Sequence, residues 1–303
     1  MIWGSTYLAI RIALEGLPPF LMAGVRFVIA GCALFGFLWL RGAPSPTPRQ
    51  WGNAAVVGGL LLLGGNGGVV VAEQSVASGL AALGVATVAL WSALFAGLWG
   101  QWPKRLEWIG LAVGFGGVAL LNVGGGLRAS SVGALALLVA PVSWALGSMW
   151  SRRLDLPSGL MASAAEMMTG GVMLLAASRL TGETGPSAVA ARPLLALAYL
   201  IVFGSWIGFS AYLFLLRRVR PVIATSYAYV NPVVAMALGV LLGGEHIARG
   251  EWAATPVILA GVALVGLAHG RTVGEQTGRS RGREPMPETE PDPSGDAGSR
   301  ERP

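Results

Sequence analysis

Long apolar runs, separated by short polar connections, dominate the first 269 residues of the chain. A bilayer core requires about 20 consecutive apolar residues per helix, and ten runs approach or exceed that length. The pattern predicts an all-α, polytopic integral membrane protein of ten transmembrane helices. Because most connections are short, neighbouring helices should be antiparallel. The predicted spans are Met1–Leu14, Pro19–Leu40, Trp51–Ala72, Ser78–Trp102, Glu107–Val123, Ser131–Trp150, Ser158–Ser178, Pro193–Leu216, Pro221–Gly243 and Glu251–His269.

The first of these runs is shorter than the others. At about 1.5 Å per residue it extends about 21 Å, less than a hydrocarbon core of about 30 Å. A signal peptide is disfavoured because no basic residue precedes the apolar stretch and Arg11 comes late in it. We therefore expect that the sequence lacks the start of helix one, which is truncated.

Composition supports the membrane class. Only 12% of the residues are charged and the mean hydropathy is +0.63, whereas a soluble domain carries about 25% charged residues. The net charge of +6 does not indicate nucleic-acid binding, because the basic residues stand singly or in pairs between apolar runs. With Cys32 as the single cysteine and no cluster of metal ligands in the sequence, we predict neither a disulfide, a metal nor a cofactor.

The polar segments predict topology. Residues 270–303 are rich in charged residues, Gly, Pro and Ser, and we expect a disordered cytoplasmic tail. If the N-terminus is inside, nine Lys or Arg residues fall in cytoplasmic loops and four in the opposite loops, which favours both termini in the cytoplasm. The nine are Arg41, Arg49, Lys104, Arg105, Arg152, Arg153, Arg217, Arg218 and Arg220, and the four are Arg128, Arg179, Arg192 and Arg249.

Short patterns recur between the two halves. Leu17-Pro18 and Leu21-Met22-Ala23 return 139 positions later, and Glu107-Trp108 returns 144 positions later as Glu251-Trp252. Two repeats of five helices follow, at 1–123 and 131–269. An odd number of helices inverts the second repeat in the membrane. Inverted repeats are a recurring architecture of secondary transporters, so the pattern predicts a small-solute transporter that works by alternating access.

Several motifs resemble a known family. They are Trp3-Gly4-Ser5-Thr6-Tyr7, Met22-Ala23-Gly24-Val25-Arg26-Phe27, Gly65-Asn66-Gly67, Val71-Ala72-Glu73, Leu106-Glu107-Trp108, Ser143-Trp144-Ala145, Glu166-Met167 and the run from Ala224 to Val233. With these motifs the chain is similar to the EamA-type exporters of the drug/metabolite transporter superfamily, in particular the YedA-like group. The resemblance implies two EamA repeats, a plasma-membrane location (the bacterial inner membrane), and export of metabolites or drugs by an ion gradient or by exchange. The family often carries Pro where Ala89 stands here, so a kink in both repeats is in doubt.

Glu166 is the first candidate for the solute or ion pathway. It lies near the middle of its predicted helix, where a buried carboxylate costs at least about 2.5–3.5 kcal/mol. It could carry a proton, bind a substrate amine, or form a structural charge pair. Arg26 lies a similar number of residues into its own helix, and the repeat register places it next to Glu166. Arg26 could form an ion pair with Glu166, bind a substrate carboxylate, or extend to the membrane surface.

A second group of candidates is polar or aromatic. Pro232 cannot donate a hydrogen bond to the carbonyl of Ala228, so we predict a kink or hinge there. Such residues could orient a polar substrate or join helices by hydrogen bonds. The group consists of Asn231, Tyr227, Tyr229, Trp3, Ser5, Thr6, Asn66 and Trp144.

Other classes of function remain as alternatives. An importer or exchanger of the same fold, or a non-transporting membrane scaffold, would share the helix pattern. A channel would show a continuous polar stripe along several helices, and an enzyme would need a catalytic constellation; the sequence shows neither, and we predict no catalytic residue. The expected partners are a small-molecule substrate, protons and the lipid bilayer, with no nucleic acid.

Overall fold

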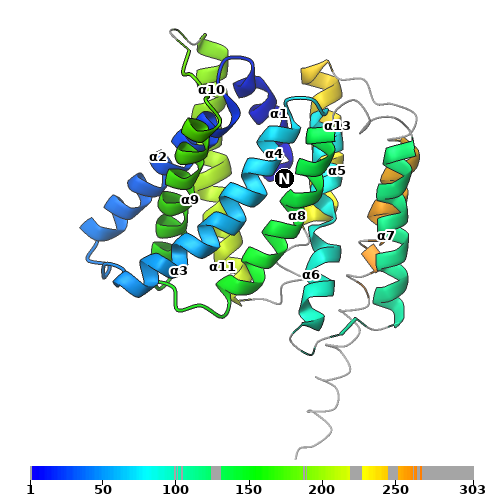
Figure 1. The fold of residues 1–303 in the computed structure, drawn as a ribbon, viewed down its shortest axis with the longest axis horizontal. Helices are drawn as coiled ribbons and strands as arrows, with labels where there is room; N and C mark the ends of the chain where they lie inside the picture. Colours follow the sequence, from blue (N-terminus) through cyan, green and yellow to red (C-terminus); the bar gives the residue numbers. More distant parts are fainter. Residues whose placement is uncertain are drawn as a thin grey trace, which may run out of the picture. The chain divides into compact units, whose positions relative to one another are not determined.

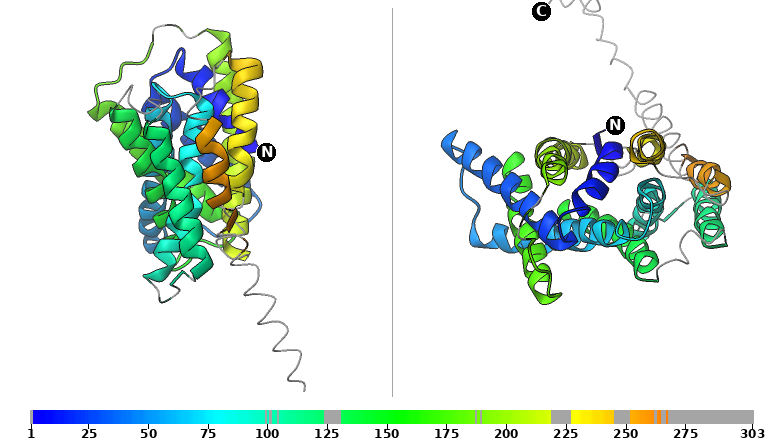
Figure 2. Two further views of the ribbon diagram at one scale, coloured as in Figure 1. Left: turned by 90° about the vertical axis from the view of Figure 1, so that its right-hand side faces the viewer. Right: turned by 90° about the horizontal axis from the view of Figure 1, so that it is seen from above.

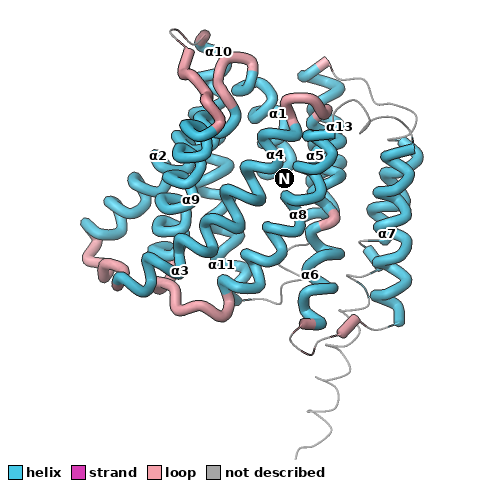
Figure 3. Tube along the Cα trace, in the orientation of Figure 1, coloured by secondary structure: helices cyan, strands magenta, loops and turns pink. Residues whose placement is uncertain are grey.

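The computed structural model describes residues 2–98, 100, 102–103, 105–123, 131–186, 188, 190–218, 227–244, 252–261, 263–264 and 267. These residues form helices and their connections, with no strand in the described part of the chain (Figure 3). The chain divides into two units, 1–269 and 270–303. The predicted tail coincides with the second unit, which lies outside the described residues.

The α-helices are labelled in Figure 1. A further helix, Trp252–Gly261, follows them and lies beside α7 (Figure 2). Its Ile258 packs against Gly117 of α7. The elements are α1 (Ile2–Leu14), α2 (Pro19–Leu40), α3 (Pro48–Gly58), η1 (Gly59–Asn66), α4 (Gly67–Ala72), α5 (Ser78–Ala86), α6 (Val88–Gly97), α7 (Arg105–Val123), α8 (Ser131–Ser151), α9 (Leu160–Leu180), α10 (Ala191–Tyr199), η2 (Leu200–Phe209), α11 (Ser210–Arg218) and α13 (Tyr227–Gly243).

A described helix lies in each of the ten predicted runs. Among the described residues, six helical stretches are long and apolar enough to cross a membrane, and three shorter apolar helices accompany them. Large apolar side chains such as Trp39, Leu135 and Leu195 are more than half exposed, as expected for faces that contact lipid. Helices suit this environment because they satisfy their backbone hydrogen bonds internally.

Glycines set the packing of α2 against α9, which we call the α2–α9 seam. A Cβ on Gly31 would lie 2.8 Å from the backbone N of Met168, and one on Gly171 would lie 2.8 Å from the backbone N of Val28. These helices therefore meet backbone to backbone. In both contacts the two residue numbers add to 199, so the helices are antiparallel with a constant register.

Two π-helical segments occupy matching places in the two halves. η1 continues α3 into α4, and η2 continues α10 into α11. The indole Nε1 of Trp3 in α1 donates to the carbonyl of Gly204 in η2 at 3.0 Å, and the hydroxyl of Ser143 in α8 donates to the carbonyl of Leu60 in η1 at 2.7 Å. Each half thus sends its first helix onto the π segment of the other half.

The fourth predicted span is interrupted although it contains no Pro. α5 ends at Ala86 and α6 begins at Val88, and the hydroxyl of Thr87 donates to the carbonyl of Gly84 at 2.7 Å. The interruption lies two residues before Ala89. In the second half Pro232 lies inside α13, which continues through it.

Hydrogen bonds connect the helix ends at each end of the bundle. At the first, which we call the basic end, Arg152 donates to the carbonyl of Leu216 at 2.8 Å and Arg217 donates to the carbonyl of Pro157 at 2.9 Å. This end carries the last residues of α8 and α11 and the first residues of α9. The carbonyl of Leu216, in the last turn of α11, would otherwise lack a partner at the helix end.

At the opposite end, Glu183 accepts hydrogen bonds from the backbone N–H groups of Phe20 and Leu21, at 3.0 and 2.8 Å. These are first-turn amides of α2, so the carboxylate caps that helix. Arg192 and Glu15 form an ion pair of 3.4 Å at this end.

Candidate functional site

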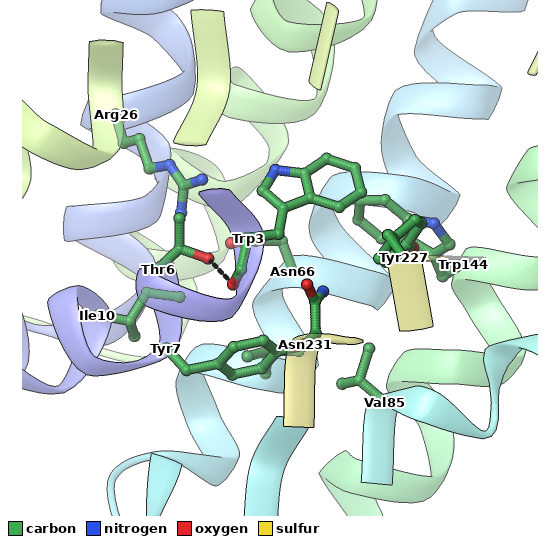
Figure 4. A pocket seen from close by; sticks show the side chains of 11 residues that line it. Trp3, Thr6, Tyr7, Ile10, Arg26, Asn66, Val85, Trp144, Tyr227 and Asn231 are labelled. Atoms are coloured by element: carbon green, nitrogen blue, oxygen red, sulfur yellow. Dashed lines mark hydrogen bonds between the residues drawn. The ribbon is translucent and has the colours of Figure 1, made fainter. Parts of the chain in front are cut away.

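A cavity lies where α1, α2, η1, α4, α5, α8 and α13 meet (Figure 4). Its volume is about 50 Å³, whereas pockets for drug-sized ligands measure about 300–1,000 Å³. In this conformation it has room for a small chemical group and no more. Its lining consists of Trp3, Thr6, Tyr7, Ile10, Arg26, Asn66, Val69, Val85, Trp144, Tyr227 and Asn231.

One face of α1 supplies four of the lining residues. Thr6 and Tyr7 follow Trp3 by three and four positions and precede Ile10 by four and three, which places all of them on the same side of a helix. Trp3 is held by its bond to Gly204, and the hydroxyl of Thr6 donates to the carbonyl of Trp3 at 2.8 Å. The α1 face is therefore ordered by contacts within its own helix and with η2.

Arg26 reaches the cavity from α2 and is only 2% exposed. Its Nε donates to the hydroxyl of Ser205 at 2.6 Å, and the guanidinium lies over the ring of Phe27, 4.7 Å from the centroid. A Cβ on residue 204 would lie 2.6 Å from Nη2, so Gly204 leaves space for the guanidinium. Nη1 is buried and has no hydrogen-bond partner within the described protein.

Two more buried polar atoms of the cavity lining lack a partner in the described chain. They are Oδ1 of Asn66 and Oδ1 of Asn231. Leaving a buried polar group without a hydrogen bond costs about 1–3 kcal/mol. Together with Nη1 of Arg26, three such atoms around one small cavity indicate a site that binds water or solute.

Aromatic rings enclose one side of the cavity in a group we call the aromatic cluster: Trp3, Trp144, Tyr212 and Tyr227. The ring centroids of Trp3 and Tyr227 lie 4.7 Å apart, and those of Trp3 and Trp144 lie 5.6 Å apart, both edge to face. Tyr212 contacts the other three rings. Its hydroxyl forms a hydrogen bond with that of Ser148 at 2.6 Å. Residues of both halves thus form this wall.

A larger hollow of about 600 Å³ lies beyond the cavity, at the end of α1. We call it the vestibule. Arg11, Glu15, Glu73 and Gln74 are among its lining residues. Ile10 and Arg11 are consecutive, so α1 runs from the cavity wall into the vestibule wall.

Glu166 is fully buried but does not line the cavity. Within the described chain its carboxylate oxygens have no hydrogen-bond partner. It interacts electrostatically with Arg217 of α11, at the basic end, and with Tyr212 of the aromatic cluster. Through Tyr212 this carboxyl group is linked electrostatically to the aromatic cluster.

Arg26 and Glu166 do not lie at the similar depth that their positions in the sequence predict. In the register of the α2–α9 seam, Arg26 is level with Met173, seven residues from Glu166. At about 1.5 Å per residue this is about 10 Å along the axis. Because the two helices are antiparallel, residues at equal distances from the two helix starts lie toward opposite ends of the bundle. The proposed ion pair is accordingly not formed in this structure, where Arg26 binds Ser205 instead.

Seven of the ten predicted pathway residues line the cavity: Trp3, Thr6, Arg26, Asn66, Trp144, Tyr227 and Asn231. Glu166 does not. Ser5 lies at the contact of α1 with α10, where its hydroxyl bonds that of Tyr199 at 2.6 Å. The side chain of Tyr229 lies outside the described part of the structure.

Tyr7, which follows Trp3 in the first motif and was a further candidate for the cavity, also lines it. Tyr212 and Ser205 could not be identified from the sequence. Tyr212 and Ser205 lie in the eighth predicted span, and no local pattern distinguishes them from packing residues.

The model of the EamA-like transporter family matches residues 1–123 and 131–267. The inner membrane transporter YedA of Escherichia coli K12, described as uncharacterized, is 50% identical over 268 residues, which cover 88% of each chain. A probable amino-acid metabolite efflux pump of Salmonella typhimurium is 23% identical and covers 87% of this chain and 91% of its own. A solved structure described only as "Crystal structure of protein" matches with a TM-score of 0.64 and 22% identity, covering 89% of this chain and 94% of its own.

Proposed function

This chain belongs to the EamA-like transporter family, and we propose that it exports small metabolites or drugs across the bacterial inner membrane by alternating access. The observation that carries the proposal is the cavity between the helices of both halves, closed to a small volume and lined by unpartnered polar atoms. Ionisable side chains in a membrane interior, such as Arg26 here, mark solute and ion pathways.

The proposed architecture is two inverted five-helix repeats, residues 1–123 and 131–269, that together make ten transmembrane helices. The matched contacts of Trp3 with η2 and of Ser143 with η1 support it. The antiparallel α2–α9 seam, which joins the second helices of the two repeats, also supports this architecture. Rocking of one repeat against the other would expose the cavity to each side of the membrane in turn.

The proposed direction and energy source rest on different observations. The Salmonella relative named as an efflux pump supports export. For coupling we propose the proton gradient or exchange, with Glu166 as the proton carrier, because this carboxyl group is fully buried without a hydrogen-bond partner in the described chain. Carboxyl groups within transmembrane segments form proton relays in pumps and transporters.

A growth-tolerance screen tests the export function. The full chain is expressed in an efflux-deficient bacterium and challenged with amino acids, organic acids, purines, amines and cationic drugs. We expect tolerance to one chemical class that is lost in Asn231→Ala, because Asn231 lines the cavity. The matched control is Asn53→Ala, since Asn53 lies at the basic end and bonds the carbonyl of Asp155.

Equal membrane abundance of the variants is checked by immunoblot. Tolerance that survives Asn231→Ala as fully as Asn53→Ala would remove the cavity from the transport path. Increased sensitivity to one class, dependent on Asn231, would indicate import instead of export.

A further inference from the structure

The charge inside the cavity has one sign. Among its eleven lining residues Arg26 is the single charged side chain, and a guanidinium remains protonated under physiological conditions. Glu73 interacts electrostatically with Arg26 but lines the vestibule instead of the cavity. A buried positive charge without an acidic partner in the same cavity is best stabilised by an anionic group that enters with the ligand.

The unpartnered atoms of the lining include the right donors for such a group. Nη1 of Arg26 is an N–H group without an acceptor in the described protein. The indole N–H of Trp144, which interacts with the hydroxyls of Tyr212 and Tyr227, is a second donor in the wall, and neither group can act as an acceptor. The amides of Asn66 and Asn231 can turn to present their NH₂ groups as further donors. The cavity therefore offers donors from α2, η1, α8 and α13 to one small acceptor group.

The remaining wall is apolar or aromatic. Ile10, Val69 and Val85 line the cavity together with the edges of the aromatic cluster. A volume of about 50 Å³ holds an anionic head group, while the rest of a solute must displace side chains. The rings of the aromatic cluster would then contact its apolar body.

We propose that this cavity binds the carboxylate of a small organic acid with an apolar or aromatic body, with Arg26 and Trp144 as donors to the carboxylate. The proposal rests on the transport function given above and names its substrate class. A single guanidinium balances the single charge of a carboxylate, whereas a phosphate dianion would bring an excess of negative charge into the membrane interior. An amine without a carboxylate would face Arg26 as a like charge.

Direct binding tests the class separately from transport. Purified full-length protein in detergent is titrated by equilibrium dialysis with four probes that share a phenyl ring: 3-phenylpropionate, phenylalanine, phenethylamine and 3-phenylpropanol. We expect both carboxylates to bind at least about tenfold more tightly than the amine and the alcohol, since hydrogen bonds to charged groups contribute about 1.5–3 kcal/mol.

Substitutions of Arg26 test whether the preference for carboxylate probes depends on its guanidinium. Arg26→Gln should weaken carboxylate binding at least about tenfold and leave the alcohol unchanged, because only the charged contact is lost. Arg26→Lys should restore part of the preference. Arg192→Gln, which removes an exposed guanidinium at the end of α10, is the matched control and should bind like the wild type. Gel filtration checks that each variant is folded and monodisperse.

Four outcomes would overturn the proposal. They are equal binding of the amine, equal binding of the alcohol, unchanged carboxylate binding by folded Arg26→Gln, and no binding of any probe by the wild type. The last would indicate a cavity that holds only water. None of these four outcomes would contradict the export function, because the growth screen measures export independently. The protein could still export solutes of another class.

Discussion

Arg26 and Glu166 are both buried, but the structure gives them different surroundings. Arg26 lines the cavity and is oriented by Ser205. Glu166 lies away from the cavity, toward the basic end, and faces Tyr212 and Arg217. Because Arg26 and Glu166 lie on opposite sides of the seam centre, they fit two separate sites, one for solute binding and one for proton coupling, better than one shared site.

The role of Glu166 leads to a prediction about proton coupling. In proteoliposomes, Glu166→Gln should abolish the acceleration of solute flux by a pH gradient, because an amide cannot release a proton. Solute exchange without a gradient should persist within about twofold, since Gln keeps the shape of the side chain and leaves the solute cavity intact. The measurement is labelled-solute flux with and without the gradient.

Glu15→Gln is the control, because Glu15 is about half exposed and pairs with Arg192 at the surface. Gradient-driven flux that remains normal in Glu166→Gln would exclude this residue as the proton carrier. Loss of both flux and exchange, with the variant still folded, would assign Glu166 a structural role.

Much of the site could be predicted at this scale from residue type alone. Polar side chains within apolar runs are costly and therefore indicate functional positions. This reasoning identifies Asn66, Arg26 and Asn231, and all three line the cavity. What could not be predicted is how Arg26 and Glu166 relate in depth, because that depends on which helices are antiparallel neighbours and in what register. Nor does the sequence reveal Tyr212, whose importance arises from its contacts alone.

At the scale of elements, the α2–α9 seam depends on residues without side chains. Replacing Gly171 by Leu should destabilise the protein by about 1–3 kcal/mol, as overpacking of a close contact does. The physical reason is that a Cβ there would lie 2.8 Å from the backbone N of Val28, and the longer side chain would force the helices apart. Thermal unfolding in detergent measures the loss.

Gly36→Leu is the matched control on the partner helix, because a Cβ at Gly36 meets no atom within 4 Å. Its unfolding temperature should stay close to that of the wild type. An equal effect of the two substitutions would mean that helix propensity, and not the seam, determines the change.

The helices themselves were largely predictable, because each run is long and apolar enough to stand out from its connections. Their internal irregularities were not. The π segments η1 and η2 and the interruption at Thr87 carry no Pro, and they arise from contacts between helices. Pro232, which the sequence does mark, lies within a continuous helix.

At the scale of the whole molecule, the charges at the two bundle ends predict its orientation. Arg152, Arg153 and Arg217 lie at or near the basic end, and we predict from this excess of positive charge that the basic end is cytoplasmic. In a Cys32→Ser background, Thr184→Cys should react with a membrane-impermeant maleimide in cells whose outer membrane is permeabilised. Arg153→Cys should react only after the inner membrane is also opened.

Both positions are exposed, so protection by packing would not explain a lack of reaction. Labelling of Arg153→Cys in closed inner membranes, with protection of Thr184→Cys, would reverse the proposed topology. The sequence counts predicted this orientation through the loops, and the structure adds which loops share one end of the bundle.

The α2–α9 seam also has a mechanical consequence. The backbones of α2 and α9 are in contact at Gly31 and at Gly171, which lie near the middle of their helices. The seam can therefore serve as a pivot about which the two helices tilt. A helix of 22 residues is about 33 Å long, so a tilt of about 10° would move its ends by about 3 Å and its centre hardly at all. Arg26 and Glu166 lie on opposite sides of this pivot. We expect a tilt that widens the space around one of these residues to narrow the space around the other.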